Sequence, residues 1–129
     1  MRSWRKLATL AVWTQLAGCS AGESPEFACQ KRLAAAREAP AAEGDSFNHQ
    51  AYAKIERKGC SAKQLAVLDQ VLTLTKDLPG LSETNEKVGA SPDKAAHMMA
   101  FQRMNDAVIA LGDLEQDITS DLAAMETPQ

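Results

Sequence analysis

Few residues in this chain have the type and spacing that enzymatic chemistry requires. Nucleophilic or acid–base catalysis needs a histidine or paired carboxylates held in a cleft with a nucleophile. The chain has only two histidines, His49 and His97, and the motifs GxGxxG, GxxxxGK[ST], HExxH and CxxC are absent. Glu115 falls on an apolar helix face, but one acid does not make a catalytic site. The sequence therefore predicts a protein that is not an enzyme.

A soft metal site is the next chemistry to consider, because methionine and histidine side chains bind copper ions. His97 stands beside Met98 and Met99, with Met104 one to two turns further on. On a helix, however, Met98 and Met99 point in different directions from His97, and Met104 falls in an apolar seam. We therefore expect these methionines to fill the core, and we predict neither a metal ion nor a cofactor.

The beginning of the chain has the composition of a secretory leader. Three basic residues precede an apolar stretch at 7–17, which is too short to span a bilayer. The stretch ends in a tetrapeptide that resembles the lipobox of bacterial lipoproteins at all four positions: Leu16-Ala17-Gly18-Cys19. The alternative is an ordinary secreted protein with a cysteine near its cleavage point.

The lipobox resemblance implies how the chain is divided. Residues 1–18 would be a signal peptide, 19–24 a tether lipidated on Cys19, and 25–127 a single domain. By the sorting pattern of that class, Ser20 implies the outer membrane, with the domain facing the periplasm or, alternatively, exposed on the cell surface. Cleavage would shift the side-chain net charge from −3 to −6 and remove both tryptophans. We predict contact with the membrane through the lipid anchor and no nucleic-acid partner.

Two further cysteines, Cys29 and Cys60, remain after the lipidated one. An exported compartment is oxidising, so an even pair predicts a disulfide bond. Metal ligation is the weaker alternative, because two thiols without a nearby histidine make half a site at best. In the loop-entropy model, closing a loop of about 30 residues stabilises a domain by roughly 3–4 kcal/mol.

The elements that position these residues are predicted to be helices, because alanine is frequent and β-branched and aromatic residues are few. Capping residues and breakers place the helices at 25–38, 45–58, 61–78 and about 91–127. The first two form an antiparallel hairpin, in which Cys29 and Cys60 are neighbours. The predicted fold is all-α: a small bundle of three to four helices with a disulfide-closed N-terminal hairpin and a long C-terminal helix.

The last predicted helix carries an apolar seam and an acidic ridge. The seam follows a 3-4 spacing and is formed by Phe101, Met104, Val108, Leu111, Ile118, Leu122 and Met125. The ridge occupies a sector of about 80° and consists of Asp106, Asp113, Asp117 and Asp121. No basic residue follows residue 103. The ridge is either a solvated face or a docking surface for a partner with a basic surface.

Basic residues gather around the two cysteines of the first half of the chain. They are Lys31, Arg32, Lys54, Arg57, Lys58 and Lys63. One interpretation places them against anionic lipid headgroups near the anchor. The other is internal pairing with the acidic second half of the chain.

Taken together, these patterns favour a non-enzymatic lipoprotein that binds another envelope protein, as an accessory component of an envelope, secretion or conjugation machine. The first alternative is a protective lipoprotein, an immunity or exclusion factor that blocks an incoming toxin or conjugation apparatus. A less favoured alternative is a lipoprotein that binds a small ligand or a metal.

Overall fold

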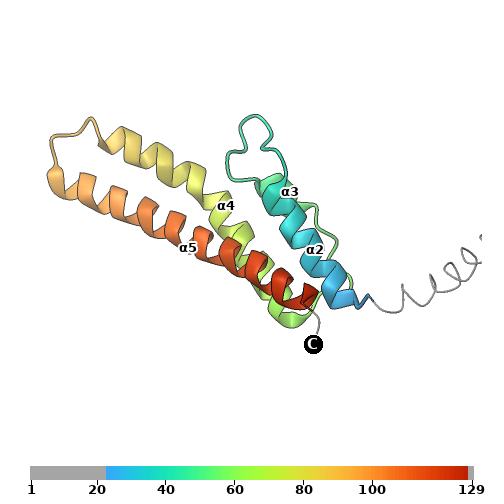
Figure 1. Cartoon of the computed structure of the whole chain (residues 1–129). Helices are drawn as coiled ribbons and strands as arrows, with labels where there is room; N and C mark the ends of the chain where they lie inside the picture. The colour runs from blue at the N-terminus through green and yellow to red at the C-terminus, as the bar shows by residue number, and fades with distance from the viewer. Residues whose placement is uncertain (1–22, 128–129) are drawn as a thin grey trace, which may run out of the picture.

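The computed structural model describes residues 23–127, which form four α-helices and no strand within that range. The helices are α2 (Pro25–Glu38), α3 (His49–Ala53), α4 (Ala62–Val88) and α5 (Lys94–Glu126). α4 and α5 form a long antiparallel hairpin, and α2 and α3 pack beside the half of it that is far from the α4–α5 turn (Figure 1). The predicted all-α bundle with a long C-terminal helix is confirmed.

The predicted signal peptide and the lipobox, with Cys19, lie outside the described residues. So does most of the predicted tether, of which only Glu23 and Ser24 are described. Among the described helices, none combines the length and the apolarity that crossing a bilayer requires.

The first helix begins and ends as predicted. The Ser24 hydroxyl accepts a hydrogen bond from the Phe27 backbone N–H at 3.0 Å, and Pro25 occupies the first helical position. After α2 ends, Asn48 donates its side-chain amide to the Ala39 carbonyl at 2.9 Å. This bond ties the C-terminal end of α2 to the start of α3.

The second helix is far shorter than predicted: the prediction of a helix over 45–58 was wrong, and α3 covers only His49–Ala53. Asp45 precedes it and caps it, because its carboxylate accepts hydrogen bonds from the backbone N–H groups of His49 and Gln50, both at 2.9 Å. The intervening residues form turns, and Asn48 takes a left-handed φ of 57° that asparagine tolerates.

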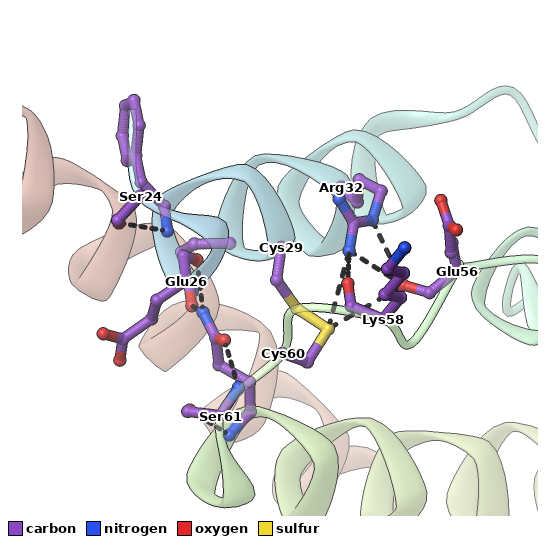
Figure 2. The surroundings of a disulfide bond; sticks show 11 residues. Ser24, Glu26, Cys29, Arg32, Glu56, Lys58, Cys60 and Ser61 are labelled. Atoms are coloured by element: carbon purple, nitrogen blue, oxygen red, sulfur yellow. Dashed lines mark hydrogen bonds between the residues drawn. A yellow bond between two sulfur atoms is a disulfide. The ribbon is translucent and has the colours of Figure 1, made fainter. Parts of the chain in front are cut away.

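The chain after α3 is not helical, and Arg32 of α2 binds two of its carbonyl groups. The Arg32 Nη2 donates to the carbonyl oxygens of Glu56 and Lys58, both at 2.9 Å (Figure 2). These carbonyls therefore point toward α2 and hold the segment after α3 against it. The turn brings Cys60 to Cys29, where the predicted disulfide is present with a Cα–Cα distance of 5.2 Å.

The third helix starts at the predicted capping box but does not stop at Pro79-Gly80. α4 continues to Val88, ten residues beyond the predicted end at residue 78. A proline inside a helix costs about 3 kcal/mol. Beyond it, α4 continues along α5 and Leu81 packs against the core, and these contacts offset the cost.

The core lies where α2 and α3 cover the α4–α5 hairpin. Its fully buried side chains include Leu33, Tyr52, Leu68, Val71, Leu78 and Ile118. Two buried glutamines link three helices: Gln64 donates to the Gln30 side-chain oxygen at 2.9 Å, and Gln30 donates to the Ile118 carbonyl at 2.9 Å. The half of the hairpin nearer the α4–α5 turn has no such third layer (Figure 1).

Candidate protein-binding surface

α5 packs on α4 through a face rotated by roughly 40° from the predicted seam. The residues that turn inward are Ala100, Met104, Ala107, Leu111, Leu114 and Ile118. The predicted seam was correct at Leu111 and Ile118 and wrong at Phe101, Val108 and Met125, which are exposed. Alanines at 100 and 107 let the two helices approach closely, so small side chains take the contact and the larger neighbours turn outward.

A cluster of large apolar side chains of α5 is exposed to solvent; it includes Met98 and Met99, so the prediction that these two methionines fill the core was wrong. Their exposed fractions are 69% for Met98, 55% for Met99, 56% for Phe101, 45% for Val108 and 54% for Ile109. All five lie on α5 within residues 98–109, toward the α4–α5 turn; we call residues 79–109, which include that turn, the arm (Figure 1). Exposed apolar side chains that cluster in this way mark interaction surfaces.

Four of these side chains belong to a longer uncharged strip that runs along the outside of α5. At 100° per residue, the strip covers a sector of roughly 120°. Every side chain in it is exposed, and none carries a charge; we call it the outer lane. Its members are Met98, Phe101, Gln102, Asn105, Val108, Ile109, Gly112, Gln116, Thr119, Ser120 and Ala123.

The predicted acidic ridge borders one margin of the outer lane. Asp106, Asp113 and Asp117 are exposed, as expected of a surface ridge. Asp121 differs, because it is half-buried and lies 3.6 Å from the Lys63 amine on α4. The first three aspartates therefore present charge to solvent beside the exposed apolar cluster, while Asp121 also joins α5 to α4.

The opposite margin of the lane holds Glu115, which sequence reasoning identified only as an acid on an apolar face. The structure pairs it with Tyr52, whose fully buried hydroxyl donates to the Glu115 carboxylate at 2.8 Å. Burial raises the pKa of Tyr52, and the hydrogen bond and the negative charge of Glu115 raise this pKa further. No local sequence signal joins two residues 63 positions apart.

Replacing Tyr52 by phenylalanine should remove this bond and cost roughly 1.5–3 kcal/mol at neutral pH, as expected for a hydrogen bond to a charged acceptor. Because the folded state disfavours the tyrosinate, the wild type should also lose stability as the pH rises above about 10, the unfolded pKa. Tyr52→Phe should lack that part of the alkaline loss. Urea unfolding of both proteins at pH 7 and above pH 10 tests this, and equal pH dependence would contradict it.

Most of the basic residues near the disulfide have internal partners. Lys31 pairs with Glu23, and Arg57 lies 2.7 Å from the Asp69 carboxylate. Arg32 binds backbone carbonyls, as described above. Arg57 and Lys63 thus pair with acids of the second half of the chain, as the internal-pairing interpretation expects, whereas Lys31 and Arg32 bind partners within the first half.

The histidines are also engaged within the fold. His49 Nδ1 lies 2.8 Å from the Thr75 hydroxyl, and His97 Nε2 contacts the Ser91 carbonyl. Within residues 23–127, no three histidine, cysteine, aspartate or glutamate side chains are close enough together to hold a metal ion. The hollow beside Asp121, with a volume of about 390 Å³, is lined by Gln30, Lys63 and Asp117 among others, and it contains neither histidine.

Comparison of the chain with protein-family models, with curated proteins and with solved structures finds no match.

Proposed function

We propose that this chain is a non-enzymatic lipoprotein of the bacterial envelope that binds another envelope protein through its α4–α5 arm. The observation that carries the proposal is the group of five large apolar side chains exposed within residues 98–109 of α5. Fully burying one such side chain is worth about 1.5–3 kcal/mol. A partner that covers several of them therefore gains several kcal/mol before the costs of association.

The charge beside this cluster supports a partner with a basic surface. Asp106, Asp113 and Asp117 are exposed along one margin of the outer lane, and no basic residue follows Arg103 in the sequence. Surface charge of one sign steers association with a partner of the opposite sign and contributes more to the association rate than to the affinity.

The lipobox supports a location at the membrane, where a lipidated Cys19 would hold the domain by a tether of five residues. Five extended residues span at most about 17 Å. α2 begins at the end of the bundle opposite the α4–α5 turn (Figure 1). The anchor and the arm would therefore lie at opposite ends, which leaves the arm free to meet a partner.

Site-specific photo-crosslinking in cells tests the proposal. A crosslinking amino acid at Phe101 or at Ile109 should capture the same envelope protein, whereas one at Lys76, an exposed position on α4, should capture none. Replacing Asp106 and Asp113 by asparagine should reduce capture at low ionic strength, where charge steering is strongest. Asp77→Asn, which removes an exposed acid from α4, is the matched control.

Two results would contradict the proposal. One is the absence of any product at both positions of the arm. The other is an equal yield of the same product at Lys76, which would show that capture does not depend on the apolar cluster.

A further inference from the structure

We propose that the partner docks on α5 with an amphipathic α-helix that lies along the outer lane and carries basic residues on the margin facing the acidic ridge. This inference rests on the proposed function and names the chemistry of the partner. It follows from the shape of the lane, from the state of its backbone and from its charge.

The shape of the lane fits one helix. From Met98 to Ala123 it runs along α5 for about 37 Å, at 1.5 Å per residue, and its width of roughly 120° matches the contact face of a packed helix. Near its middle stands Gly112, where an added Cβ would meet no atom within 4 Å. A glycine inside an exposed helix costs about 1 kcal/mol, and it lets a second helix approach closely.

The backbone of α5 also favours a helical partner. Its N–H and C=O groups are paired within the helix, so the lane offers no free backbone groups to an incoming strand. A segment that buries its backbone against the lane must satisfy its own hydrogen bonds, and a helix does so by itself. Gln102, Asn105 and Gln116 supply the uncharged polar contacts that such an interface uses.

Charge decides what kind of helix covers the lane. One margin carries the exposed Asp106 and Asp113, while Glu115 on the other margin is already bound by Tyr52. Only one margin therefore offers free negative charge, and a partner helix with basic residues on that side is complementary to it. A second copy of this chain is a poor occupant, because its own lane has no basic residue and it brings a second acidic ridge close to the first.

Two synthetic peptides test this inference on the purified full chain. The first is a helix of about three heptads with a leucine stripe and lysines along one margin; the second is identical but has glutamates in place of the lysines. Fluorescence anisotropy should show the lysine peptide binding at least tenfold more tightly at low ionic strength. The ratio should shrink as the Debye length falls from about 30 to 8 Å.

Variants of the chain locate the binding. The double change Phe101→Gln and Ile109→Gln should weaken binding of the lysine peptide at least tenfold. Met125→Gln should leave it unchanged, because Met125 is an exposed apolar residue outside the lane. Circular dichroism checks that each variant remains folded, and a single variant, Ile109→Gln, gives a smaller loss in the same direction if the double variant unfolds.

Three results would overturn the inference: equal affinity for both peptides, no binding of either peptide, or equal loss in the Met125 variant. Sedimentation that shows the chain pairing with itself through the lane, so that Ile109→Gln yields monomers, would assign the lane to a second copy. If the peptides fail while crosslinks at Ile109 still form in cells, the proposed function stands and the partner uses a different docking element.

Discussion

Replacing Cys60 by serine is expected to lower the free energy of unfolding by roughly 3–4 kcal/mol. The bond joins residues 31 positions apart and holds the non-helical segment 54–60 against α2. The core contains few large side chains, so the loss is a large fraction of a typical domain stability of 5–15 kcal/mol. Urea unfolding followed by circular dichroism measures it.

The reduced wild type is the control for this variant, and its unfolding midpoint should coincide with that of Cys60→Ser. Serine suits position 60 because this residue is half-buried, whereas Cys29 is completely buried. Limited proteolysis should cut within residues 54–60 first in both reduced forms. An unchanged unfolding midpoint in Cys60→Ser would show that other contacts, such as those of Arg32, suffice to hold the segment.

The second large effect concerns lipidation, which the lipobox resemblance predicts at Cys19. Cys19→Ala is expected to abolish acylation completely, because alanine removes the side chain that the lipid would occupy. In cells, the variant should fail to incorporate labelled palmitate and should accumulate as a precursor that retains residues 1–18. Cys60→Ser should still be labelled, since it leaves the lipobox intact. Labelling of Cys19→Ala at the wild-type level would exclude lipidation at this cysteine.

The starts of α2 and α4 and the disulfide were predictable because they follow local rules. A serine cap followed by proline at 24–25, and a serine with glutamine three positions later at 61–64, satisfy the first N–H groups of their helices from within one turn. Residues 25–127 contain two cysteines, so only one disulfide pairing within the domain had to be considered. These signals do not depend on the rest of the fold.

The helix ends could not be read in the same way, because contacts distant in sequence decide them. α3 begins four residues after Asp45, whose carboxylate accepts from the N–H groups of His49 and Gln50, and the segment after α3 is held to α2 by Arg32, more than 20 residues upstream. α4 passes through Pro79 because the residues beyond it pack on α5. In both places tertiary contacts override a local signal.

The candidate surface was predictable in part. The acidic ridge was visible from spacing alone, since it needs only the period of one helix. The seam beside it was misplaced at Phe101 and Val108, because hydrophobicity patterns favour these two residues over the alanines at 100 and 107. Only the distance between α4 and α5 decides which of the two sets is buried. The same rotation exposes Phe101 and Val108, whereas Met98, Met99 and Ile109 lay outside the predicted seam.

Pro79 and the missing third layer divide the bundle into two regions of unequal local stability. The disulfide, the paired glutamines and the buried Tyr52 all lie in the half covered by α2 and α3, whereas the arm has only the contacts of two helices. Backbone amides of the arm should therefore exchange with solvent through local opening, at free energies below that of global unfolding. A partner that binds the arm must keep its two helices ordered, and this ordering reduces the net binding free energy.

Gly80 lies in the arm with open space around it, and alanine there would favour the helix by up to about 1 kcal/mol. Affinity for a partner thus depends on residues that never touch it, through the helical order of the arm.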